Sequence, residues 1–132
     1  MYNAGGATVA SPGASVAVPL PLNTTDVLSN MSATANTLIT GESGIYEISY
    51  HVAGAFSAQT LLTTAVFAGG TELSASHLTE SHSPPGGNIS WDKTFIAVLA
   101  AGAQLQIRLW STAAGNLSAT DRGILLQAKR IA

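Results

Sequence analysis

The chain has 132 residues, of which 46% are hydrophobic and only 9% are charged, with a formal net charge of −2 and no cysteine. This length suits a single domain spanning residues 1–132. The five lysines and arginines are too scattered for a nucleic-acid surface, and the lack of cysteine excludes disulfides and zinc–thiolate sites. Average soluble domains carry about 25% charged residues, so this chain is short of charged surface. No apolar run approaches the roughly 20 residues of a membrane-spanning helix. We therefore expect much of the surface to be buried in an oligomer and not inserted in a membrane.

The pattern of apolar residues predicts short strands along the whole chain. Apolar stretches at Ala4–Ala10 and Ser15–Leu22 come first, and Pro19 and Pro21 allow only an edge strand in the second stretch. A polar connection follows at Asn23–Asn30. The other predicted strands are Ala33–Thr40, Ile45–Phe56, Thr60–Ala68, Thr71–Thr79, Ile89–Leu99, Ala103–Ser111 and Ile124–Ala128.

Strand Ile45–Phe56 has the clearest alternation and begins at a Gly-Glu-Ser-Gly turn. One face is apolar with two phenols and is predicted to pack on the core; it comprises Tyr46, Ile48, Tyr50 and Val52. The other face carries Glu47, Ser49 and His51, so it is predicted to meet water or a neighbouring subunit. Ala103–Ser111 alternates in the same way, with Leu105, Ile107 and Leu109 inward and Trp110 outward.

Turn residues divide the second half of the chain. Gly69-Gly70 predicts a two-residue hairpin after Thr60–Ala68, and Ser81–Asn88 (SHSPPGGN) predicts a surface loop. Thr112–Gly123 is predicted to be a polar loop. The continuous apolar run of Ile124–Ala128 predicts a final strand that is buried on both faces and lies between strands formed earlier.

Eight to ten short strands at this spacing are typical of an all-β sandwich or barrel. A buried last strand beside an early one is a Greek-key feature, so a jelly-roll β-sandwich is the favoured architecture.

The sequence offers little chemistry for catalysis. His77 and His82, with Glu80 between them, suggest a metal site, but they bracket a Pro-Gly loop and no third ligand is placed, so a structural or surface role is favoured. No G-x-S-x-G nucleophile elbow and no phosphate-binding glycine loop occurs, and seven scattered acids do not define a carboxylate pair. We therefore expect a protein that is not an enzyme and has no cofactor or metal.

Surface modification and sugar binding are two further possibilities. Four Asn-X-Ser/Thr sequons occur, at Asn23, Asn30, Asn88 and Asn116, and they hint at a glycosylated surface, although Ser/Thr-rich loops explain them as well. Trp91 and Trp110 could form a sugar-stacking platform, but tryptophans on strands are more often core or interface residues.

Three segments in order resemble the C1q and tumour-necrosis-factor-like superfamily. Gly44-Ile45-Tyr46-Glu47-Ile48 resembles its G-x-Y-x-[FI] signature. Leu99-Ala100-Ala101-Gly102, followed by Leu105 and Ile107, resembles its L-x-x-G-D-x-[VI] turn, with Ala103 in place of the usual aspartate. Gly123-Ile124-Leu125-Leu126 is similar to its closing strand.

Within the superfamily, the phrases YNAGG, VPLPLNTTDVLSN and AKRIA look closest to the C-terminal domain of bacterial collagen-like (BclA-type) glycoproteins of the spore exosporium. The resemblance implies a homotrimer at the end of a collagen-like stalk, on an extracellular or spore surface, with strands Ile45–Phe56, Ile89–Leu99 and Ile124–Ala128 in the sheet nearest the threefold axis. Glu47, Ser49 and His51 are then the expected trimer-interface residues. No Gly-X-Y repeat is present, so any stalk lies outside this sequence.

The resemblance leaves other partners open. The alternative is a trimeric head that binds a host receptor or glycan, as in a phage fibre tip or an adhesin, through loops such as Ser81–Asn88 and Thr112–Arg122. A cytokine-like signalling ligand is a third class, which would require a eukaryotic source.

Overall fold

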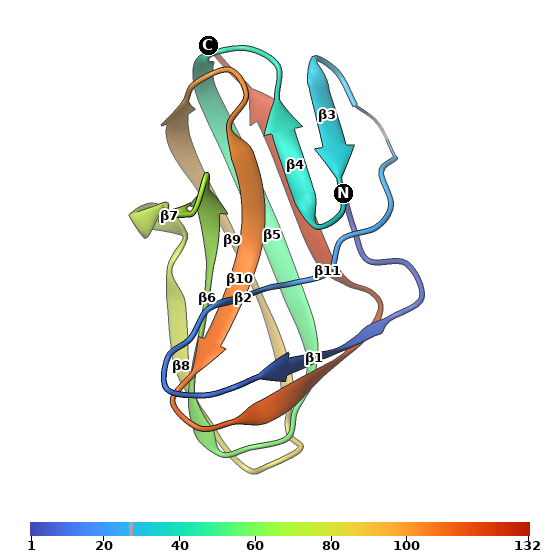
Figure 1. Ribbon diagram of the computed structural model, residues 1–132, viewed down its shortest axis with the longest axis vertical. Coiled ribbons are helices and arrows are strands. Elements are labelled where there is room, and N and C mark those ends of the chain that lie inside the picture. The colour runs from blue at the N-terminus through green and yellow to red at the C-terminus, as the bar shows by residue number, and fades with distance from the viewer. Residues whose placement is uncertain (27) are drawn as a thin grey trace.

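The computed structural model describes residues 1–26 and 28–132, and in it two β-sheets pack face to face (Figure 1). The elements are β1 (Ala7–Ser11), β2 (Val18–Pro19), β3 (Met31–Thr34), β4 (Thr37–Thr40), β5 (Gly44–Phe56), β6 (Thr60–Ala68), β7 (Thr71–Glu72), the 3₁₀ turn η1 (Ser74–Ser76), β8 (Leu78–His82), β9 (Asn88–Leu99), β10 (Gln104–Ser111) and β11 (Gly115–Arg130). Val27, in the predicted connection Asn23–Asn30, lies outside the described residues. Among the residues that are described, no helix is long and apolar enough to cross a membrane.

One sheet has four strands in the order β1-β11-β5-β9, and the other has seven. The seven-stranded sheet has the order β3-β4-β10-β6-β7, with β2 paired to β10 and β8 paired to β6. The last strand, β11, therefore lies between β1 and β5, as predicted for a Greek-key arrangement. The expected all-β sandwich is confirmed.

The core lies between the sheets and is built from alternate residues of each strand. The inward side chains of β5 are Tyr46, Ile48, Tyr50 and Val52, all at most 2% exposed, which confirms the predicted inner face. Leu105, Ile107 and Leu109 of β10 meet them from the other sheet and are fully buried. Each such side chain contributes about 1.5–3 kcal/mol by leaving water.

Tyr50 links the two sheets through its hydroxyl. The hydroxyl donates to the carbonyl oxygen of Ser76 at 2.6 Å and lies 3.1 Å from the Thr64 hydroxyl. The Ser76 hydroxyl in turn accepts from the amide of Val66 at 2.7 Å. Burial raises the pKa of Tyr50 to about 12, so the phenol stays neutral and η1 stays attached to the core.

The prediction of a polar loop over Thr112–Gly123 is wrong. β11 starts at Gly115, and Leu117 and Ala119 point into the core while the polar residues next to them, Asn116, Ser118 and Thr120, are exposed. The strand shifts register between Ala119 and Ile124, where Arg122 has a φ of 59°. The small and polar outward residues gave this half of the strand the composition of a loop.

Two other predicted strands are divided. Ala33–Thr40 is a hairpin of β3 and β4, because the chain reverses at Asn36, which has a φ of 64° and belongs to the residue types that tolerate this conformation. Thr71–Thr79 contains β7, η1 and the start of β8, although β7 and β8 do both pair with β6.

The prediction that Ile124–Ala128 is buried on both faces is also wrong. Ile124 and Leu126 are fully buried, whereas Gln127 is exposed. A strand in a two-sheet sandwich has one face on the core, and its other face is the outer surface of the sheet.

Candidate assembly surface

The outer face of the four-stranded sheet carries the residues predicted for the interface. The strands expected nearest the threefold axis, Ile45–Phe56, Ile89–Leu99 and Ile124–Ala128, correspond to β5, β9 and β11 and do share this sheet. Because all its pairings are antiparallel, residues opposite one another project from the same face.

Glu47, Ser49 and His51 lie along the outer face of β5, as the alternation predicted. Glu47 is exposed, and Ser49 and His51 are half-buried. The Ser49 hydroxyl lies 3.4 Å from Oε1 of Gln127 on β11, and His51 Nδ1 lies 3.8 Å from the Asp92 carboxylate on β9. Asp92 itself is 82% exposed, so this contact is open to water. These residues form a polar band across the middle of the sheet.

An apolar corner lies at one end of the same face and consists of Ile45, Ile96, Val98 and Ile131. Val98 of β9 is 80% exposed, Ile96 is 60% exposed, and Ile45 of β5 lies directly opposite Val98. Ile131 follows the end of β11, and its amide donates to the carbonyl of Ile45 at 2.8 Å. Four branched apolar side chains thus meet at a corner that nothing in the described chain covers.

The other end of this face has small side chains. Ala53 lies opposite Ser90 of β9, and Ala55 lies opposite Asn88 of β9 and Ser118 of β11. Alanine and serine project little from a sheet, so this end leaves room for another protein surface to approach closely.

β9 is an edge strand of 12 residues that pairs with β5 along its whole length. The sheet order gives it no partner on its other side among the described residues. Exposed edge strands are usually covered in native proteins, because their free backbone groups invite pairing with other chains. The apolar corner and the open edge therefore occur on the same strand.

The two tryptophans lie in different surroundings. Trp110 is on the outer face of the seven-stranded sheet, where its ring meets Phe67 and His77 edge to face at centroid distances of 5.9 and 5.7 Å. The Arg108 guanidinium lies 4.7 Å from the centre of the Phe67 ring. Trp91 packs against the core, and its Nε1 is buried without a hydrogen-bond partner in the described part of the chain. The structure does not bring the two rings together.

The histidines of the predicted metal site are also separated. His82 is buried, and its Nε2 lies 3.1 Å from the carbonyl oxygen of Phe56. His77 is on the surface, where Nδ1 lies 2.5 Å from the Glu72 carboxylate and Nε2 lies 3.0 Å from the Thr79 hydroxyl. Within residues 1–26 and 28–132, no cluster of three or more His, Cys, Asp or Glu side chains is placed to hold a metal ion.

The four sequon asparagines are all exposed. Asn23 is the most constrained, since its side chain bonds with the backbone of Ala4 at 2.8 and 3.1 Å. Asn88 and Asn116 lie on the strands of the four-stranded sheet, at the end with small side chains.

The apolar corner is the part of this surface that the sequence reasoning missed. Ile96 and Val98 lie within the run Phe95–Leu99, which is apolar at every position. Such a run does not show which residues face out. Ile96 pairs with Glu47 and Val98 pairs with Ile45, and both partners lie on the outer face of β5. This register shows that Ile96 and Val98 face outward, whereas Phe95 and Leu99 face the core.

The whole sequence, residues 1–132, matches the family model described as the BclA C-terminal domain. No curated protein matches the chain.

Proposed function

Because this chain belongs to the BclA C-terminal domain family, we propose that residues 1–132 form one domain that trimerises and caps a collagen-like filament protein of the spore surface. The family is that of the C-terminal domains of collagen-like exosporium proteins, and this membership supports an extracellular surface as the location of the chain. In this role the domain is structural and catalyses no reaction. Its partners are two further copies of itself and the collagen-like stalk of the parent chain.

The observation that carries the proposal is the apolar corner on the edge strand β9. A side chain such as Val98, at 80% exposure, gains nothing from remaining in water. Large exposed apolar patches mark interaction surfaces. A chain with only 9% charged residues is also short of the polar surface that keeps monomers apart.

The arrangement of face and edge suits a closed ring. We infer that the β9 edge of one protomer, with Ile96 and Val98, packs against the outer face of the four-stranded sheet of the next. Such a head-to-tail contact uses two different surfaces and closes into a ring when the rotation allows it. Three protomers match the three chains of a collagen helix. Glu47, Ser49 and His51 then lie inside the ring, and the small residues near Ala53 and Ala55 permit close approach.

The mechanism is to hold three chain ends together. A collagen helix must bring three chains into register before it can propagate, and this step depends on concentration when the chains are free. A trimeric domain converts the step into an intramolecular one with a high effective concentration.

The test is refolding of the stalk in the parent protein with and without residues 1–132. After heating, the triple-helix signal in circular dichroism should return faster with the domain, at a rate independent of protein concentration. An equal, concentration-dependent rate in both proteins would contradict the proposal.

A further inference from the structure

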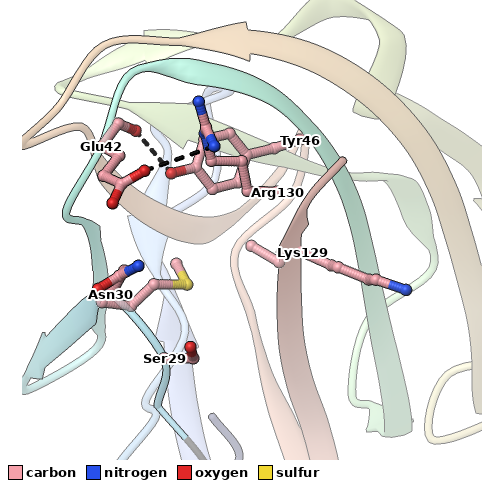
Figure 2. A pocket seen from close by; sticks show the side chains of 8 residues that line it. Ser29, Asn30, Glu42, Tyr46, Lys129 and Arg130 are labelled. Atoms are coloured by element: carbon pink, nitrogen blue, oxygen red, sulfur yellow. Dashed lines mark hydrogen bonds and ion pairs between the residues drawn. The ribbon is translucent and has the colours of Figure 1, made fainter. Parts of the chain in front are cut away.

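A groove runs between β3 and the C-terminal half of β11. It consists of two adjoining cavities of about 420 Å³ each, which share Met31, Ala128 and Lys129 in their linings. Figure 2 shows the far end of the groove, where Asn30 lies across from the end of β11 and the Lys129 side chain points away. The backbone of β11 thus forms one wall.

The N-terminal residues already pair with this strand at the near end of the groove. Leu126 and Met1 exchange both backbone hydrogen bonds, each at 2.8 Å, and the amide of Asn3 donates to Ile124 at 2.9 Å. Met1 is therefore in the register of an antiparallel strand next to β11. Figure 1 shows the N-terminus between β3 and β11.

Beyond Leu126 the same edge of β11 has no backbone partner among residues 1–26 and 28–132. Alternate residues of a strand direct their N–H and C=O groups to the same side, so Ala128 and Arg130 present theirs to the groove, as Leu126 does to Met1. Gln127 and Lys129 direct their backbone groups to β5 on the other side. This alternation continues to Ile131, whose amide donates to the carbonyl oxygen of Ile45. Two donors and two acceptors therefore face the groove.

The nitrogen of Met1 lies in surroundings that favour an amide. Burial lowers the pKa of this α-amino group from its ordinary value, and the nearby Asp26 carboxylate offsets only part of the effect. A peptide N–H at the same place would donate the same hydrogen bond to Leu126 without a charge to desolvate.

We propose that the residues preceding Met1 in the parent protein occupy this groove as an added strand, antiparallel to β11 over Gln127–Arg130. The inference rests on the proposed function, in which the chain continues upstream into a stalk. The chain direction at Met1 leads the upstream residues into the groove. Because Tyr2 lies opposite Leu125 and Met1 opposite Leu126, the residue directly before Met1 lies opposite Gln127 and the residue before that one lies opposite Ala128. This is strand addition within one chain.

The side chains define what the added strand must carry. Residues opposite one another share a face, so the second upstream residue points to the same side as Ala128, toward Met31 and Leu38 in the groove lining. An apolar residue fits there. At the far end the Arg130 guanidinium and the Glu42 carboxylate form an ion pair at 3.4 Å, and the Tyr46 hydroxyl donates to the Glu42 carbonyl at 2.6 Å. This closed polar end (Figure 2) marks where the strand leaves the groove.

The first test compares hydrogen exchange in the parent protein and in a chain that starts at Met1. The amides of Ala128 and Arg130 should become at least tenfold more protected when the upstream residues are present. The amide of Leu126 is the internal control, since it is bonded to Met1 in both proteins. Equal exchange at Ala128 in the two proteins would overturn the proposal, and so would a natural chain that begins at Met1.

A cysteine pair tests the register. The chain has no cysteine, so Gln127→Cys with a cysteine directly before Met1 should close a disulfide in air, because opposite residues of this type of pair lie about 4.5 Å apart. Lys129→Cys with the same upstream cysteine is the matched control, offset along the strand by about 7 Å and out of reach. Equal cross-linking of both pairs, or of neither, would reject the register.

These outcomes are independent of the proposed function. If the protein is a trimer but the Ala128 amide is not protected, the added strand is rejected and the proposed assembly stands. If the Ala128 amide is protected in a monomer, the proposed assembly is rejected and the added strand stands.

Discussion

The double variant Ile96→Lys/Val98→Lys tests the role of the apolar corner. Both side chains lie on the outer face of β9 and are 60% and 80% exposed, so their replacement leaves the core of the protomer unchanged. The matched control is Leu61→Lys, which replaces an apolar side chain of 49% exposure that lies on β6, in the other sheet.

The expected size follows from burial of the two side chains. Full burial of a valine or isoleucine contributes about 1.5–3 kcal/mol. If the interface covers what is now exposed, about two thirds of this is realised at each position, or about 2–4 kcal/mol per protomer. Three protomers give about 6–12 kcal/mol per trimer, before the cost of burying two lysine charges. Since 1.4 kcal/mol is a factor of ten, the trimer should dissociate at all micromolar concentrations.

The assay is sedimentation velocity over a dilution series, with far-ultraviolet circular dichroism to show that the β-structure is retained. The double variant should sediment as a folded monomer, and Leu61→Lys should sediment like the unaltered chain. A double variant that associates as strongly as the unaltered chain would refute the assignment of the apolar corner to the interface. Equal dissociation in Leu61→Lys would show that the effect is not specific to β9.

Three further variants test the fold. Because the pKa of Tyr50 is raised to about 12, the contribution of the neutral phenol to the free energy of unfolding is fully present below its usual pKa of about 10 and is lost as pH rises from there to about 12. Tyr50→Phe removes this titration, so between about pH 9 and pH 11 the variant should lose about 1.4 kcal/mol less unfolding free energy than the unaltered chain. An unchanged loss in urea titrations would contradict this. Leu117→Ala should cost about 2–5 kcal/mol in urea unfolding, because the side chain is fully buried in β11, whereas a loop residue would cost less than about 0.5 kcal/mol. Gly54→Ala should lower the melting temperature, because a Cβ there would lie 2.5 Å from the carbonyl oxygen of Ser118, and an unchanged melting temperature would show that the two strands can move apart.

The sequence predicted the strands whose two faces differ. The inner face of β5, with its four buried side chains, follows directly from alternation, and so do Leu105, Ile107 and Leu109 of β10. Alternation failed where the outward residues were small and polar, as between Gly115 and Ala119, because the solvent-facing side of such a strand has the same composition as a loop.

Features set by one residue's backbone conformation or by pairing between distant segments could not be predicted. The turn at Asn36 depends on one residue adopting a positive φ inside a run that otherwise suits a single strand. The outward position of Ile96 and Val98 becomes clear only from the register of β9 against β5. The groove depends on residues 1–3 pairing with residues 124–126, which lie at the other end of the chain.

The mass of the unaltered chain in solution tests the central claim most directly. Light scattering at two concentrations tenfold apart, with a thermal melt of the same sample, separates a tight trimer from a monomer. The protomer mass is 13.4 kDa, and a trimer of about 40 kDa that survives dilution and melts at high temperature is the expected result. A well-folded species of 13.4 kDa at both concentrations would contradict the assembly, and the apolar corner would then need another partner.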